Sequence, residues 1–167
     1  MDTKYFEKIR IFDGGMGQEL LSKGLISKGT LWSASALIEK KFHKLVIDAH
    51  ISYINAGADI IVTNNFSARK IRFIQNKVLN KFQYANEQAG ILANKAREIS
   101  KQNILIAGSL PSQSDTYVED ERSSSEIQSD FEEQAKIISP YVDFFYLDVV
   151  SSGRAVSYTH LRAHETR

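Results

Sequence analysis

Four short apolar runs, separated by longer amphipathic stretches, are the feature that most limits what this chain can fold into. The runs are IRIF, ADIIV, NILIAG and VDFFYL, at residues 9–12, 58–62, 103–108 and 142–147. Each run is almost continuously apolar rather than alternating, which is typical of strands buried on both faces of a parallel sheet. The pattern therefore predicts an α/β fold with about four parallel strands and helices outside them.

Helical patterns fill the spaces between the apolar runs. Apolar residues recur at steps of three and four over 37–55, and Gly57 follows in the usual position of a helix-ending glycine. A second helix is predicted over about 81–100. A third is predicted over about 123–139, where a serine followed three residues later by Glu126 fits a capping box.

Composition excludes several classes of protein. The 167 residues indicate one domain, and 21 basic against 20 acidic residues give a net charge of +1, so no electrostatic argument favours nucleic acid or an anionic membrane. No apolar run reaches membrane-spanning length, and the N-terminus lacks the apolar segment of a signal peptide, so a cytoplasmic location is expected. The chain contains no cysteine, which excludes disulfides, thiolate metal ligands and cysteine nucleophiles among these residues.

Polar residues follow each predicted strand, where ligands bind in parallel α/β folds. Two of them are carboxylates, Asp13 and Asp148, and such a pair suits a substrate that carries an ammonium group. Polar strand ends also serve solubility, so this pattern alone leaves a binding site and a structural role equally open. The residues at the four strand ends are Asp13; Thr63, Asn64 and Asn65; Ser109; and Asp148 with Ser151 and Ser152.

Other motifs are interpreted more simply. GGMG at 14–17 matches neither glycine pattern of the phosphate-binding loops, and the neighbouring aspartate would repel an anion. His43 and His50 are expected to pack or to face solvent. His160 and His164 have the spacing of a helical metal pair but lack the glutamate of an H-E-x-x-H motif.

Four motifs, in their order and spacing, resemble the homocysteine S-methyltransferase family. They are DGGMGQEL at 13–20, LWSASAL at 31–37, H..Y..AGADIIVTNNF at 50–66 and AGSLP at 107–111. The resemblance implies a zinc-dependent (β/α)₈ TIM barrel that methylates homocysteine to methionine, with S-methylmethionine, S-adenosylmethionine, betaine or methyltetrahydrofolate as donors in different members. A barrel of this kind takes about 250 residues, so four strands imply its N-terminal half.

The resemblance also implies roles for individual residues. Asp13, beside Gly14, matches the family's homocysteine-binding aspartate. Asp148 stands where the family usually has a glutamate that contacts the substrate, so it keeps the charge with a shorter reach. Trp32 matches a tryptophan near the active site, and residues 63–65 match the second strand end that lines the pocket.

The chemistry that the resemblance implies needs more than these residues. In the family, zinc holds the homocysteine sulfur as a thiolate, and three cysteines from the later strands bind the metal. With no cysteine present, we expect this chain to bind no zinc, to contain no catalytic residue and to be inactive in methyl transfer alone. Two alternatives remain open: a non-catalytic half-barrel that binds an amino acid or a partner chain, and a different α/β enzyme, such as a lyase that uses both aspartates.

The domain interpretation divides the chain near Ala155. Residues 1–155 are predicted to be a partial homocysteine-binding barrel domain. Residues 156–167, VSYTHLRAHETR, resemble translated adaptor sequence and are interpreted as a non-native tail, with a genuine short terminal helix as the alternative. The open edges of a half-barrel predict poor solubility, a loose monomer or pairing with a second copy.

Overall fold

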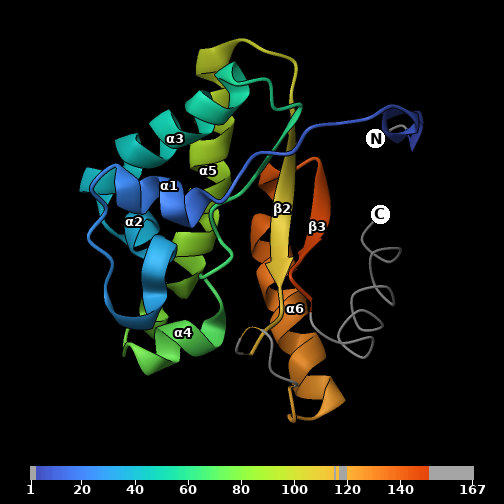
Figure 1. Ribbon diagram of the computed structural model, residues 1–167. Coiled ribbons are helices and arrows are strands. Elements are labelled where there is room, and N and C mark those ends of the chain that lie inside the picture. Colours follow the sequence, from blue (N-terminus) through green and yellow to red (C-terminus); the bar gives the residue numbers. More distant parts are fainter. Residues whose placement is uncertain (1–2, 115, 117–119, 151–167) are drawn as a thin grey trace.

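The computed structural model describes residues 3–114, 116 and 120–150, which form a parallel sheet covered by helices (Figure 1). The strands are β1 (Ile60–Val62), β2 (Leu105–Pro111) and β3 (Phe144–Asp148). They lie in the order β1-β2-β3, and both pairs are parallel. The predicted α/β architecture with a parallel sheet is therefore confirmed.

The predicted first strand, residues 9–12, is not a full strand. Phe12 forms a single parallel bridge to Ile60 of β1, and the carbonyl of Ile11 accepts a hydrogen bond from the Ile60 amide at 3.1 Å. Within the described residues this segment has a strand neighbour on one side only. Ile9 is 95% exposed and Ile11 is 58% exposed. The prediction of a strand buried on both faces is therefore wrong for this run, because the tertiary contacts among the described residues leave both isoleucines exposed to solvent.

Two of the three predicted helices are confirmed almost to the residue. They are α5 (Phe82–Ser100) and α6 (Ser124–Ile138). Ser123 caps α6: its side chain accepts a hydrogen bond from the Glu126 amide, and the Glu126 carboxylate accepts one from the Ser123 amide at 3.0 Å. This reciprocal pair is the predicted capping box.

The predicted helix over 37–55 is broken in the structure. α2 (Ser35–Ile38) ends before Glu39, whose backbone is extended, and α3 (His43–Asn55) begins after a short 3₁₀ turn, η3 (Lys40–Phe42). The Glu39 carboxylate lies 2.8 Å from the ammonium of Lys28, on a different segment of the chain. This tertiary contact accompanies the break, and apolar spacing alone does not reveal it.

Several short elements have too little periodicity to be predicted. One of them, α1, begins directly after the two glycines that follow the first strand-end aspartate, and it contains the third, Gly17. These elements are η1 (Thr3–Glu7), α1 (Met16–Ser22), η2 (Gly29–Ala34), α4 (Lys70–Gln75), η4 (Leu79–Lys81) and η5 (Ser139–Tyr141).

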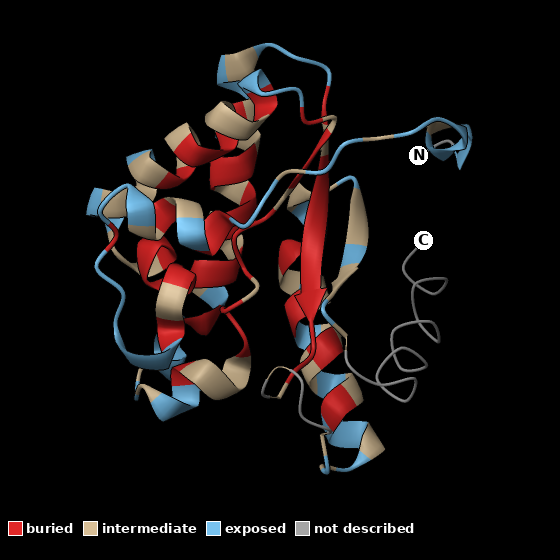
Figure 2. Cartoon of the chain, viewed as in Figure 1, coloured by how far each residue is buried: buried red, intermediate tan, exposed pale blue. Residues whose placement is uncertain are grey.

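The largest apolar cluster of the core lies among the helices α1, α2, α3 and α5 and includes Leu20, Leu37, Val46 and Leu92. Two smaller clusters lie between the helices and the sheet. α3 and α5 pack on β1 and β2 through one apolar cluster, and α6 packs near the ends of β2 and β3 through another. β2 is buried along almost its whole length (Figure 2). In the described part of the chain, no helix is both long and apolar enough to cross a membrane. The two clusters comprise Ile54, Ile61, Ala93, Ala96, Ile104 and Ile106, and Leu110, Ile127 and Phe131.

Candidate functional site

A cavity of about 310 Å³ lies at the carboxyl ends of the strands. We call it the strand-end cavity. It brings together six of the seven residues that the sequence nominates for substrate binding: Asp13, Gly14, Trp32, Thr63, Asn64 and Asp148. Its other lining residues are Phe12, Gly15, Met16, Gly17, Ser33, Val62, Phe66, Tyr146 and Val149.

A larger depression of about 390 Å³ lies between α4 and α6. Its two cations are already neutralised, because Lys70 lies 2.6 Å from Glu133 and Arg122 lies 2.6 Å from Asp130. None of the nominated residues lines it. We therefore take the strand-end cavity as the candidate site.

Asp13 is held in place in the cavity by two hydrogen bonds to β1. Its backbone amide donates to the Ile60 carbonyl at 2.9 Å, and its Oδ2 accepts from the Val62 amide at 3.0 Å. The side chain is only 3% exposed. The pKa of the Asp13 carboxyl is raised to about 7, mainly by burial and in smaller part by the charge of Asp148, while the Val62 hydrogen bond acts in the opposite direction.

His50 lies behind Asp13 and is completely buried. Its Nδ1 is 3.9 Å from Asp13 Oδ2, and neither ring nitrogen has a hydrogen-bond partner among the described residues. Burial lowers the pKa of His50 to about 3, so the ring is neutral and forms no ion pair with the carboxylate. The charge of Asp13 is therefore not neutralised by this neighbour and is left for a ligand.

His50 is the neighbour of the site that residue-by-residue reasoning missed, because we expected it only to pack or to face solvent. Its position in the motif H..Y..AGAD is the signal that could have found it. The next residue of that motif, Tyr53, lies against Gly14, where an added Cβ would come within 2.9 Å of the ring.

Asp148, at the end of β3, supplies the second carboxylate of the cavity. Its Oδ2 accepts a hydrogen bond from the Ser109 hydroxyl at 2.8 Å. Burial raises the pKa of Asp148, and the Ser109 hydrogen bond opposes that shift. Asp13 and Asp148 thus give the cavity two anionic groups, and the described residues that line it include no lysine or arginine.

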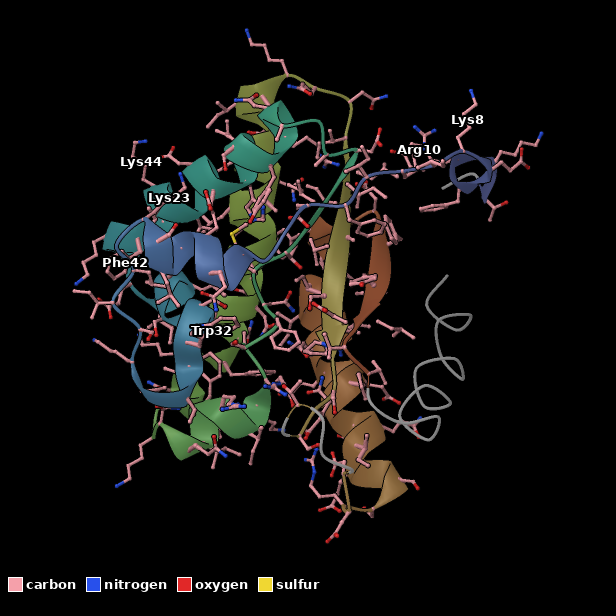
Figure 3. All side chains as sticks on the ribbon, viewed as in Figure 1. Lys8, Arg10, Lys23, Trp32, Phe42 and Lys44 are labelled. Carbon is pink, nitrogen blue, oxygen red and sulfur yellow. The ribbon has the colours of Figure 1, made fainter. Side chains whose placement is uncertain are left out.

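Trp32 forms a wall of the cavity against α1 (Figure 3). A Cβ added at Gly17 would lie 2.5 Å from the indole ring, so the ring needs a glycine there. Trp32 itself has a φ of 45°, a conformation that costs a bulky residue on the order of 1–3 kcal/mol. At Gly15, by contrast, an added Cβ would meet nothing within 4 Å.

Of the three residues that follow β1, two line the cavity and the third supports it from behind. Thr63 and Asn64 line the cavity, and the Asn64 amide donates to the Ser33 carbonyl at 3.2 Å. Asn65 is fully buried and is absent from the cavity lining; its amide donates to the Ser109 carbonyl at 2.9 Å. It therefore supports the wall from behind.

The residues present do not fit the zinc site that the family resemblance implies. The 167 residues include no cysteine, and among those whose structure is described no group of three His, Asp or Glu side chains could hold a metal ion. The described side chains therefore supply no ligand set for zinc. Ser151, Ser152, His160 and His164 lie outside the described residues.

Comparison with known proteins gives consistent matches. A family model described as homocysteine S-methyltransferase matches residues 10–165. Homocysteine S-methyltransferase of Escherichia coli (strain K12) is 31% identical over 117 residues, which cover 62% of this chain and 35% of that protein. Homocysteine S-methyltransferase 1 of Zea mays is 36% identical over 64 residues, which cover 38% of this chain and 19% of that protein. The chain thus matches about a third or less of these relatives' length.

Solved structures show the same fold. The oxidized form of the homocysteine methyltransferase MmuM from Escherichia coli superposes with a TM-score of 0.85 at 21% identity, over 98% of this chain and 61% of that one. The metallated form superposes with a TM-score of 0.82 at 22% identity, over 98% of this chain and 62% of that one. The predicted fold class, half of a (β/α)₈ barrel, is confirmed.

Proposed function

The chain belongs to the homocysteine S-methyltransferase family, and we propose that its strand-end cavity binds homocysteine, the methyl acceptor in the formation of methionine. The observation that carries the proposal is the pairing of two carboxylates, Asp13 and Asp148, in one partly desolvated cavity whose described lining contains no lysine or arginine. Attraction between opposite charges is stronger in such a cavity than in water. An α-ammonium group is the complementary partner.

We propose a division of roles among the lining residues. Asp13 and Asp148 hold the ammonium group, and the backbone of Gly14 lines the cavity beside them, where its missing side chain leaves room for the Tyr53 ring. The Trp32 ring closes one wall, and Thr63 and Asn64 present polar groups at the end of β1. Asn65 does not line the cavity and supports its wall from behind, through the hydrogen bond to the Ser109 carbonyl. Residues 1–155 would form this substrate-binding part.

We further propose that these 167 residues bind homocysteine but do not transfer a methyl group. Family members use zinc to hold the sulfur as a thiolate, and no thiolate ligand can come from this chain. The missing cysteines also favour the alternative of a half-barrel that binds an amino acid or a partner chain without turnover. Family membership argues against an unrelated lyase. A cytoplasmic location stays a prediction.

Titration calorimetry of the full chain with homocysteine at pH 8 tests the binding proposal. We expect saturable binding of homocysteine and none of 4-mercaptobutanoate, which keeps the thiol and carboxylate but lacks the ammonium. Asp13→Asn should weaken homocysteine binding at least about tenfold, because a hydrogen bond to a charged group contributes about 1.5–3 kcal/mol. Asp48→Asn is the matched control, since Asp48 lies outside the cavity lining and pairs with Lys44 at 2.6 Å on α3. Equal affinity of the wild type and Asp13→Asn would refute the assignment.

A methyl-transfer assay tests the second part of the proposal. The full chain is incubated with homocysteine, S-methylmethionine and Zn²⁺, and methionine formation is followed. We expect none above the protein-free rate. Methionine formation that depends on the protein would show that turnover does not need cysteine ligands.

A further inference from the structure

Ser109 connects β2 to a carboxylate of the strand-end cavity. Its hydroxyl donates to Asp148 Oδ2 at 2.8 Å, and Ser109 is completely buried. In the sheet register Ser109 lies opposite Tyr146, two residues before Asp148 on β3. The serine therefore reaches along the strand end to a group that the cavity presents to its ligand.

The backbone of Ser109 is fixed by two side chains from the segment after β1. Its amide donates to Thr63 Oγ1 at 3.0 Å, and its carbonyl accepts from the Asn65 amide at 2.9 Å. The Thr63 hydroxyl in turn donates to Asn65 Oδ1 at 2.7 Å. These contacts hold the backbone of Ser109 and leave its hydroxyl to Asp148.

A network of buried amides extends this support into the helices. Asn86 of α5 accepts from Asn65 at 3.2 Å and from Gln134 of α6 at 3.0 Å. Gln113 donates to Gln134 Oε1 at 2.8 Å. All four amides are at most 1% exposed. Gln113 Oε1 has no hydrogen-bond partner among the described residues, but the bonds from Asn65 to Asn86 and from Asn86 to Gln134 tie the support of Ser109 to α5 and α6.

We propose that Ser109 is a positioning residue, which fixes one oxygen of the Asp148 carboxylate and leaves the other for the cationic group of the ligand. The identity of that ligand as homocysteine rests on the proposed function. The link between Ser109 and Asp148 does not, because it follows from contacts within the protein.

Electrostatics explains why Asp148 needs this donor. Asp148 shares the cavity with Asp13, whose pKa its charge helps to raise, while His50 behind Asp13 is neutral and offers no compensation. Burial also favours the protonated form of Asp148, and the hydrogen bond from Ser109 favours the ionised form. Without Ser109, the pKa of Asp148 would rise further and its ionised form would be less favoured.

The test follows the Asp148 carboxyl carbon by NMR during a pH titration of the full chain, with the signal assigned through its loss in Asp148→Asn. In Ser109→Ala we expect the Asp148 pKa to rise by about half a unit to one unit, since one unit corresponds to about 1.4 kcal/mol. Homocysteine affinity at pH 7 should fall about fivefold or more.

Ser35→Ala is the matched control. Ser35 is buried to almost the same extent, and its hydroxyl accepts from the Lys28 amide at 3.0 Å without lining the cavity. This variant loses a buried hydroxyl but should leave the Asp148 pKa unchanged. An Asp148 pKa that is the same in wild type, Ser109→Ala and Ser35→Ala would overturn the proposal.

A second measurement needs no variant of Ser109 and so does not depend on its folding. In the wild type, the Cβ signal of Ser109 should move with the same pH midpoint as the Asp148 carboxyl. A Ser109 signal that ignores this titration would also overturn the proposal. If the two signals titrate together but homocysteine does not bind, the proposed function fails and the positioning role stands.

Discussion

Asp13 has a raised pKa of about 7 in the folded protein, against an ordinary value of 3.8. Between these two pH values the folded state keeps a proton that the unfolded state has released. The stabilisation from this proton is complete below the unfolded pKa and is lost as the pH rises through the folded pKa. A residue suited to binding a cation therefore weakens the fold at the pH where it is charged.

Replacing Asp13 with asparagine should stabilise the protein above pH 7, because the amide cannot ionise. The difference in unfolding free energy between Asp13→Asn and wild type should grow from pH 5 to pH 8. Its upper limit is about 4 kcal/mol, from about 1.4 kcal/mol for each pH unit between the two pKa values. Thermal unfolding at the two pH values measures it.

His50 does not disturb this comparison, because it is present in both proteins. Its lowered pKa of about 3 gives the opposite trend: stability is lost as the pH falls below the ordinary value of 6.5. If the difference in unfolding free energy between wild type and Asp13→Asn is constant from pH 5 to pH 8, the raised pKa of Asp13 is contradicted.

Gly17 and Gly15 offer a matched pair of substitutions at the cavity wall. Gly17→Ala places a methyl group within 2.5 Å of the Trp32 ring, and overpacking of this kind costs about 1–3 kcal/mol. Gly15→Ala meets nothing within 4 Å and should change stability by at most about 0.5 kcal/mol. Trp32 is the one tryptophan of the chain, so its fluorescence should shift in the first variant only. Identical spectra and stabilities of both variants would show that the ring moves freely.

At the scale of elements, the start of α6 is set by local chemistry. Ser123 caps the helix, and the exposed pair with Glu126 completes the box. The capping box can be recognised from the sequence alone because it needs no tertiary partner. The start of α6 was therefore predicted correctly. The break before α3 is harder to predict, since it occurs at Glu39, whose carboxylate pairs with Lys28 from the segment before η2 as well as with Lys41.

Ser123→Ala should lower the unfolding free energy by about 1 kcal/mol through loss of the cap. Ser129→Ala, at an exposed position within α6, should be neutral or slightly stabilising, because alanine has the higher helix propensity. Chemical denaturation of both variants measures the difference. If both lose the same stability, the cap does not set the start of α6.

At the scale of the whole molecule, one face of the sheet is less well covered than the other. Phe145 and Leu147 of β3 pack under the helices, so Phe144 and Tyr146 face the other way. There Phe144 contacts the ring of Phe6 at 5.5 Å between centroids. Tyr146 is 39% exposed. Aromatic side chains and an incompletely paired edge both favour association.

We expect the full chain to self-associate as its concentration rises, and sedimentation velocity at several concentrations measures this. Ile11→Lys, at a 58% exposed position on the edge segment, should reduce association, since lysine on an edge opposes pairing with another strand. Ile26→Lys is the control, because Ile26 is 72% exposed but lies away from the sheet. A monomer at every concentration would contradict the expectation.

The sequence by itself determined the features that depend on local pattern. Continuous apolar runs identified three strands, a capping motif located the start of α6, and motif order indicated the family. Strand-end position also nominated Asp13 and Asp148 as partners in one site. Each of these follows from neighbours in the chain, or from the rule that parallel strands end at the same edge.

The tertiary structure alone decided what depends on residues far apart in the chain. It reduced the first predicted strand to one bridge and left Ile9 and Ile11 exposed, because the burial of an apolar run depends on tertiary contacts that its own sequence does not encode. It placed Asn65 behind the cavity and joined Ser109 to Asp148 across two strands. It also buried His50 beside Asp13, where desolvation favours the neutral form of both side chains.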